Sequence, residues 1–530
     1  MEEVNGVRTV RQTVKGETTK VPIRYMDTSE FDAMFTEKVK QEVDNLDLGQ
    51  RINEAETKVS AMNTKVNGLA TTVSETKNLV DEYTDDIATN TANIKTNTED
   101  IAEIINYIGL SKEIVGLQVD YKNKTFKRLA NAVGRSAGAD FDSFNMYGGR
   151  RKCNVADNGT INAFYGDSGY VEDGSNGQVM VYQPKFYYCV IPLEIEKQAG
   201  GKGYHLRKAN YYVSDLPRTG FKVHPAFIDA NGNEVDYVFI GSYEGSIYDT
   251  SAGVYLTADE QVMSNSEDKF CSIANVKPAS GLSQDLTRPK IEQMAQNRGS
   301  NWHLENIKIV SMEQLLCMIE LGTLNFQNAI GQGVVSISDN GSYNCSSLTG
   351  STASLGNGTG RASQTINDKG GTQTTETADG KTSICYRGVE NDWGNIWKFI
   401  IDPNIYGNGS MKGGEPYYCD DYAFAENKNS GNYKGAGFTV TNASGYVSAM
   451  GWSEECDWMF IASECSGNSS LPVGDYHWVT ANLNGYRIAH LGGRWAYGID
   501  AGGFSWSLTN GVGYRARTVG GRLVYVPKKA

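Results

Sequence analysis

A heptad repeat between residues 59 and 108 constrains this 530-residue chain more than any other feature of its sequence. Two core positions recur in alternating steps of three and four residues, and Lys, Glu, Asp, Asn and Thr fill most positions between them. One apolar stripe on an otherwise polar helix predicts a coiled coil, which requires partner helices. The first core position holds Val59, Val66, Val73, Val80, Ile87, Ile94, Ile101 and Ile108, and the second holds Met62, Leu69, Thr76, Tyr83, Asn90, Asn97 and Ile104.

The second core position indicates how many helices associate. β-branched residues at the first position, with leucine at the second, would favour a dimer. Here the second position carries Thr76, Asn90 and Asn97 and ends with Ile104, and buried polar layers of this kind fix the register of a coiled coil. Asparagine at this position resembles the trimeric fibre stalks of phages and bacterial adhesins. We therefore expect residues 29–109 to form a parallel homotrimeric coiled coil, with a dimer as the alternative.

Residues 1–28 form a polar segment in which valines alternate with charged and threonine residues. This β-tending segment is too short to bury a core of its own. It is either a docking piece that pairs with another protein or a frayed terminus.

The overall charge narrows the possible partners. The net charge is −13 and the pI is near 5.1, which argues against binding to nucleic acid or attachment to anionic lipid. No run of about 18 apolar residues is present, so we expect no membrane insertion. The first 25 residues lack the apolar stretch of a signal peptide, so we expect none. We therefore expect the protein to assemble in the cytoplasm.

Residues 110–530 read as a β-rich head with one clear helix, in residues 301–324, which predicts an α+β fold class. The 59 glycines and 30 tyrosines of the chain fit a loop-rich β structure. Nine scattered cysteines form no CxxC pair, so we expect buried, reduced thiols. Residues 325–383 are rich in Gly, Ser and Thr and predict a solvent-facing insertion or an ordered β-loop, with a binding face as a further possibility.

Two kinds of position alternate in the terminal segment, which we define as residues 486–526. Glycines and apolar residues form a framework, because glycine permits positive φ and close backbone approach. The framework positions are Gly492, Gly493, Trp495, Gly498, Ala501, Gly502, Phe504 and Leu508, followed by a final strand over residues 520–525. The residues between them share no single chemical character, and their Tyr, Trp, Ser, Asn and Arg content is typical of a binding surface. Ordinary exposed polar residues on a glycine-rich β edge are the alternative interpretation.

Three motifs in the same order resemble a known family. GGRWAYGIDAGGF (residues 492–504), followed by VGGRLVYV (519–526), looks like the C-terminal repeat of phage receptor-binding proteins with a C-type-lectin fold, some of which are diversified by retroelements. WGNIWKF (393–399) is similar to a motif of the formylglycine-generating-enzyme-like branch of that fold. FIASECSGNSSLPVGDYHW (460–478) matches the segment that precedes the repeat.

The resemblance implies a phage tail fibre or tail-tip protein in the virion. Residues 1–28 would then dock on other tail or baseplate proteins, and the head would be C-type-lectin-like and would adhere non-covalently to a bacterial surface receptor, either a polysaccharide or a protein. The receptor-contacting residues that it implies are Arg494, Ala496, Tyr497, Ile499, Asp500, Ser505, Trp506, Ser507, Asn510, Tyr514 and Arg515. From the residues themselves we expect no cofactor and no metal.

Sequence signatures of catalysis are not found. The chain contains no HExxH, GxSxG or GxxxxGK[ST] motif. The formylglycine-generating relatives use cysteines near their C-terminus, whereas the last cysteine here is Cys465, so we expect no oxidase activity. A tailspike-type glycan depolymerase and a structural fibre protein without receptor contact remain as alternatives, and the depolymerase would require two carboxylates beside a groove.

Overall fold

A computed structural model describes residues 2–529 except 5–6, 15–16, 24–32, 34–35, 37–47, 258–266, 282–284, 339–344 and 368–372. The chain divides into two compact units, Met1–Asn106 and Tyr107–Ala530. The first unit contains a three-stranded antiparallel sheet and most of a long helix. The strands, in spatial order, are β1 (Glu2–Val4), β2 (Val7–Val14) and β3 (Glu17–Ile23), and the helix is α2 (Leu48–Leu110).

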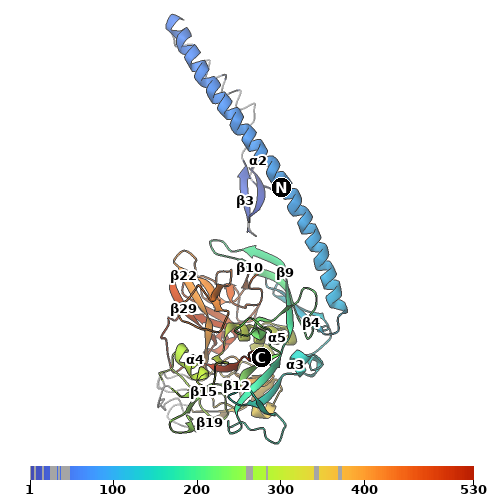
Figure 1. The fold of residues 1–530 in the computed structure, drawn as a ribbon, viewed down its shortest axis with the longest axis vertical. Coiled ribbons are helices and arrows are strands. Elements are labelled where there is room, and N and C mark those ends of the chain that lie inside the picture. Colours follow the sequence, from blue (N-terminus) through green and yellow to red (C-terminus); the bar gives the residue numbers. More distant parts are fainter. Residues whose placement is uncertain are drawn as a thin grey trace. The chain divides into compact units, whose positions relative to one another are not determined.

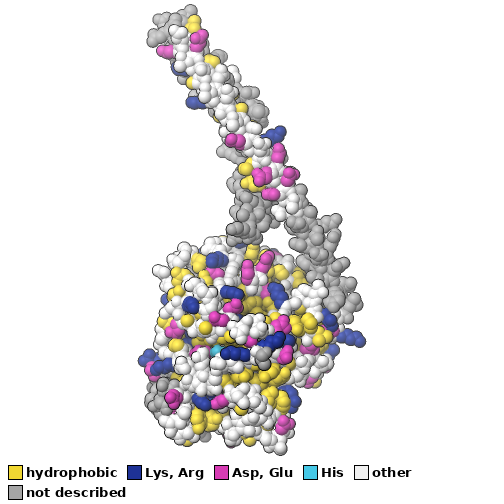
Figure 2. Space-filling model, viewed as in Figure 1, with side chains coloured by type: hydrophobic (Ala, Val, Ile, Leu, Met, Phe, Trp, Pro, Cys, Tyr) yellow, Lys and Arg dark blue, Asp and Glu magenta, His cyan; other side chains and the backbone are white. Residues whose placement is uncertain are grey.

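Helix α2 is 63 residues long, about 95 Å at 1.5 Å per residue. Its side chains are described between residues 52 and 90 with one gap at Ala88, and the apolar heptad residues among them are largely uncovered within this single chain. Figure 2 shows hydrophobic side chains on the surface of the described part of this helix. Val59, Leu69 and Val73 are 51%, 48% and 64% exposed. The hydroxyl of Thr76 donates a hydrogen bond to the carbonyl of Thr72, so this core-position side chain satisfies its donor within its own helix. The heptad residues from Ile94 onward lie outside the described side chains.

The second unit is β-rich and is built around three larger sheets (Figure 1). The segment that follows helix α2 forms an antiparallel hairpin of β4 and β5. The seven-stranded sheet contains β4 (Ile114–Asp120), β5 (Thr125–Ala130), β9 (Tyr187–Lys197), β10 (Tyr204–Ser214), β11 (Lys222–Val223), β26 (Ala449–Trp452) and β27 (Ala462–Glu464). The six-stranded sheet contains β6 (Arg151–Val155), β7 (Ile161–Phe164), β8 (Gln178–Pro184), β12 (Tyr237–Glu244), β16 (Trp302–Leu304) and β32 (Arg522–Tyr525).

The eight-stranded sheet holds most of the terminal segment. Its spatial order is β24-β23-β22-β29-β30-β28-β25, with β31 pairing in parallel with β22. In chain order the strands are β22 (Trp397–Asn408), β23 (Glu415–Cys419), β24 (Tyr433–Gly435), β25 (Gly445–Tyr446), β28 (Tyr476–Val479), β29 (Asn484–Gly492), β30 (Gly502–Leu508) and β31 (Val519–Gly520). The smaller sheets are made of β13 (Ser246–Asp249), β14 (Val254–Tyr255) and β15 (Lys269–Cys271); β17 (Gly360–Ala362), β20 (Ser383–Tyr386) and β21 (Val389–Glu390); and β18 (Gln364–Asn367) with β19 (Gln373–Glu376).

The predicted helix of the head is confirmed as α5 (Ile307–Leu321), and it lies in the core. Asn306 caps its first turn by accepting from the backbone N–H groups of Lys308 and Ile309, and Gly322 ends it with a φ of 72°. A helix buried on all sides must pair its charged residues, and Glu313 accepts two hydrogen bonds of 2.6 Å from buried Arg150. Within the described part of the second unit, the other α-helices are α3 (Asn145–Gly148), α4 (Arg288–Gln296) and α6 (Phe326–Ala329). The sequence pattern did not indicate the nine-residue helix α4.

The segment 325–383 is only partly a solvent-facing insertion. Val334, Ile337 and Cys345 are buried in a cluster with Ile396 and Trp495. The expectation of buried, reduced thiols is confirmed, because all nine cysteines are free and eight are buried. The aromatic side chains of Trp393, Phe399 and Trp458 are also buried.

Candidate functional site

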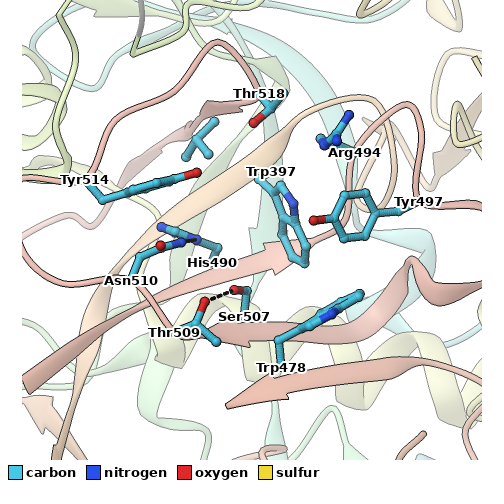
Figure 3. Close-up of a pocket in the computed structure, with 11 residues that line it drawn as sticks. Trp397, Trp478, His490, Arg494, Tyr497, Ser507, Thr509, Asn510, Tyr514 and Thr518 are labelled. Carbon is cyan, nitrogen blue, oxygen red and sulfur yellow. Dashed lines mark hydrogen bonds between the residues drawn. The ribbon is translucent and has the colours of Figure 1, made fainter. Parts of the chain in front are cut away.

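A cavity of about 310 Å³ opens within the eight-stranded sheet and its loops, and we call it the aromatic pocket (Figure 3). Residues of the terminal segment lie there beside Trp397 and Trp478, which precede that segment in the chain. The lining residues are Trp397, Trp478, His490, Arg494, Tyr497, Ser507, Thr509, Asn510, Tyr514, Thr518 and Val519.

Four adjacent strands form the floor of the aromatic pocket. The register places His490 of β29 opposite both Phe399 of β22 and Ser507 of β30, and Ser507 opposite Trp478 of β28. Trp397 begins β22, two residues before Phe399 and therefore on the same face of the strand. Sheet pairing thus brings together side chains that are separated by more than 100 residues in the sequence.

Three aromatic side chains pack edge to face along one side of the pocket. The ring centroids of Trp397 and Tyr497 are 5.4 Å apart at an interplanar angle of 82°, and those of Trp478 and Tyr497 are 5.1 Å apart at 70°. The guanidinium of Arg494 lies over the Tyr497 ring, 4.9 Å from its centroid. Cation–π and edge-to-face contacts together hold this wall in place.

His490 and Tyr514 form the opposite region of the pocket. Their rings lie 5.3 Å apart at 36°, and Nδ1 of His490 is 3.4 Å from the amide nitrogen of Asn510. Burial lowers the pKa of His490 to about 3, so the imidazole is neutral at neutral pH. Burial and the neighbouring Tyr497 raise the pKa of Tyr514, whereas the positive charge of Arg494 lowers it.

Backbone hydrogen bonds to Val335 and Ile337 anchor the loop between β29 and β30. Trp495 is buried, its carbonyl accepts from the N–H of Ile337 at 2.7 Å, and the N–H of Gly498 donates to the carbonyl of Val335 at 2.9 Å. The hydroxyl of Tyr446 donates to the carboxylate of Asp500 at 2.5 Å at the far end of the loop. Arg494 and Tyr497 are therefore presented by a loop that is anchored on both sides.

The structure distributes the eleven predicted receptor-contacting residues among three environments. Arg494, Tyr497, Ser507, Asn510 and Tyr514 line the aromatic pocket. Ala496, Ile499, Asp500 and Arg515 are exposed or half-buried outside its lining, and Arg515 forms an ion pair with Asp285. Ser505 and Trp506 are buried.

The expectation that Ser505 and Trp506 lie on the surface is wrong. Both side chains are 0% exposed, because every residue of β30 is buried and the strand is covered on both faces. The hydroxyl of Ser505 donates to the carbonyls of Asp500 and Tyr476, and Nε1 of Trp506 donates to the carbonyl of Phe460. These two residues therefore belong to the framework.

Sequence reasoning missed several lining residues. Trp397 belongs to the motif at 393–399, and no local pattern separates a pocket residue from a core residue there; it is 5% exposed and lines the pocket. Trp478, which ends the segment 460–478, lines it as well. His490 and Thr518 had no distinguishing pattern, whereas Thr509 could have been found as a polar residue beside the glycine-rich loop 510–513.

The described residues contain no group of three or more His, Cys, Asp or Glu side chains arranged to hold a metal ion. None of the eleven residues that line the aromatic pocket is an aspartate or a glutamate. Among the helices of the described ranges, none is long and apolar enough to cross a membrane.

Comparisons with known proteins give one kind of similarity. No family model and no curated protein matches the chain. Among solved structures, the chain is similar to the P3c variant of a protein named Major Tropism Determinant, with 12% identity and a TM-score of 0.24 over 71% of each chain. The U1 variant gives 13% identity and a TM-score of 0.25, again over 71% of each chain. TM-scores of this size do not establish a common fold.

Proposed function

We propose that this chain is a phage tail fibre or tail-tip receptor-binding protein that adheres to a bacterial surface through the aromatic pocket. In this proposal residues 1–28 dock on other virion proteins, residues 29–109 form a homotrimeric coiled coil, and residues 110–530 form a C-type-lectin-like head. The interspersed positions of the terminal segment are those that a diversifying retroelement would alter.

One observation carries the proposal. Five of the predicted contact residues line a single cavity, while the framework residues Trp495, Gly502 and Phe504 between them are buried. Rigid aromatic rings that offer contact area, beside small polar groups that form hydrogen bonds, make up a recognition surface. The uncovered apolar stripe of α2 supports a fibre, because it requires partner helices.

The same residues give less support to the two alternatives, a tailspike-type glycan depolymerase and a structural fibre protein without receptor contact. A depolymerase places two carboxylates about 5–10 Å apart on either side of the scissile bond, and the lining residues of the aromatic pocket supply neither. A fibre that only acts as a spacer has no use for a cavity walled by Trp397, Tyr497 and Tyr514.

Adsorption measurements on a panel of bacterial strains test the proposal. The double variant Tyr497→Ala/Tyr514→Ala should reduce binding of the labelled protein to susceptible cells by about 30-fold or more, because aromatic anchors are typical hot spots worth 2 kcal/mol or more. Val512→Ala is the matched control, since Val512 is exposed in the same segment but does not line the pocket. Undiminished adsorption of the double variant, with its fold intact by circular dichroism, would place the binding site elsewhere.

A further inference from the structure

The aromatic pocket differs in charge from the chain that contains it. The chain carries a net charge of −13. Among the eleven described residues that line the pocket, Arg494 is the one that is charged at neutral pH, because burial keeps His490 neutral. A local positive charge in an acidic protein selects for an anionic ligand group and discriminates against cationic ones.

The field of Arg494 extends across the cavity. Its guanidinium lies over the Tyr497 ring, and Figure 3 shows Arg494 and Tyr497 on one side of the cavity and Tyr514 on the other. Burial raises the pKa of Tyr514, and the positive charge of Arg494 partly opposes that rise, so its field reaches the opposite wall. A ligand group between these walls would feel the attraction of the guanidinium, which is the side chain best suited to bidentate contact with a carboxylate.

The remaining lining residues suit a polyhydroxylated ring. Ser507, Thr509 and Thr518 offer hydroxyl groups that can donate or accept, and the amide of Asn510 adds both kinds of group. The hydroxyls of Ser507 and Thr509 already lie 3.2 Å from each other, which places two such groups side by side. Aromatic side chains line the same cavity, and about 310 Å³ is at the lower end of the range for small-ligand cavities.

The packing of the aromatic rings excludes the other common use of such a cluster, a cage for a quaternary ammonium group. In a cage the ring faces surround an empty centre large enough for the cation. Here the centroids of Trp397, Trp478 and Tyr497 are 5.1–5.6 Å apart with edges against faces, so the rings fill that space themselves. Arg494 would also repel a cation.

We propose that the aromatic pocket binds a carboxylate-bearing sugar residue of a surface glycan, with Arg494 as the partner of the carboxylate and the Ser, Thr and Asn side chains as partners of the hydroxyls. This inference rests on the proposed function and names the ligand class of the same site.

Binding of the full-length chain to a panel of matched sugars tests it. The acidic probes are the methyl glycosides of glucuronate, galacturonate and N-acetylneuraminate, and the neutral probes are the methyl glycosides of glucose, galactose and N-acetylglucosamine. We expect at least one acidic probe to bind about tenfold or more tightly than every neutral probe, because a hydrogen-bonded charge pair contributes about 1.5–3 kcal/mol. Arg494→Gln should abolish this preference, and Arg494→Lys should retain part of it. Lys434→Gln, which removes an exposed cation outside the lining, should leave it unchanged.

Three outcomes would overturn the inference: neutral probes binding as tightly as acidic ones, a preference for acidic probes that survives in Arg494→Gln, or no binding of any probe by a protein that still binds cells. The last outcome would leave the proposed function standing and assign the pocket a different class of ligand. Failure to bind both the probes and every strain of the cell panel would instead count against the proposed function itself.

Discussion

At the scale of single residues, the chemistry of the aromatic pocket depends on His490 being neutral. Its ring packs 4.9 Å from Phe399 and 5.3 Å from Tyr514, and it is 1% exposed. Burial disfavours the imidazolium and lowers the pKa of His490 to about 3, against about 6.5 in an unfolded chain. Arg494 therefore remains the charged group of the pocket over the whole pH range in which the protein would meet a cell.

This neutrality has a consequence for stability that can be measured with His490→Phe, which keeps an aromatic ring and removes the titration. Below pH 6.5 the unfolded state takes up a proton on His490 and the folded state does not, so lowering the pH favours unfolding. The free energy of unfolding of the wild type, minus that of the variant, should fall by up to about 1.4 kcal/mol per pH unit between pH 6 and pH 4. Denaturant titrations at a series of pH values give this difference. A constant difference over that range would mean that His490 is not held neutral by burial.

At the scale of elements, glycines set the path of the loop that carries Arg494 and Tyr497. Gly493 follows β29 with a φ of 81°, and a side chain there would place its Cβ 2.6 Å from the Cβ of Ala501. Both the backbone conformation and the close approach therefore require glycine. By contrast, Gly511 has no heavy atom within 4 Å of a Cβ position.

Gly493→Ala should therefore lower the free energy of unfolding by more than about 1–2 kcal/mol, the usual penalty for a non-glycine residue at positive φ. It should also weaken cell binding, because the loop must shift to relieve the contact with Ala501. Gly511→Ala is the control and should change both quantities little. Thermal unfolding and the strain-panel adsorption assay measure the two effects; equal behaviour of the two variants would contradict the assigned role of Gly493.

The terminal segment also shows how far sequence could predict this site. The glycine framework and the final strand were readable because positive φ and short β runs have local signatures, as at Gly493 and β32. The burial of Trp506 was not readable, because in a strand covered on both faces side-chain alternation no longer separates core from surface. The contributions of Trp397 and Trp478 depend on long-range strand pairing, which no local pattern specifies.

At the scale of the whole molecule, the apolar stripe of α2 is left exposed to solvent in the single chain. Val59, Val73 and Ile87 occupy the first core position and are all exposed. Exposed β-branched residues at seven-residue intervals over a helix of 63 residues are stabilised when other helices cover them. The homotrimer that we propose would have a mass of about 174 kDa, three times the 57.9 kDa of one chain.

Trimerisation would matter for adhesion because three linked heads bind a cell surface with high effective concentration, which raises avidity by a factor of about 10²–10⁴ over a single site. Val73→Asp places a charge in the core of the coiled coil, and we expect it to yield chains of 57.9 kDa by light scattering. Cell binding should then fall by about 10²–10⁴-fold, whereas the affinity of each head for a soluble sugar probe should not change, since the pocket is formed within one chain.

Ser74→Asp introduces the same charge one residue further on, outside the two core positions, and should leave both mass and cell binding unaltered. If Val73→Asp chains were monomeric and still held cells as tightly as the wild type, adhesion would be a property of the single head, and the stalk would serve only to connect it to the virion.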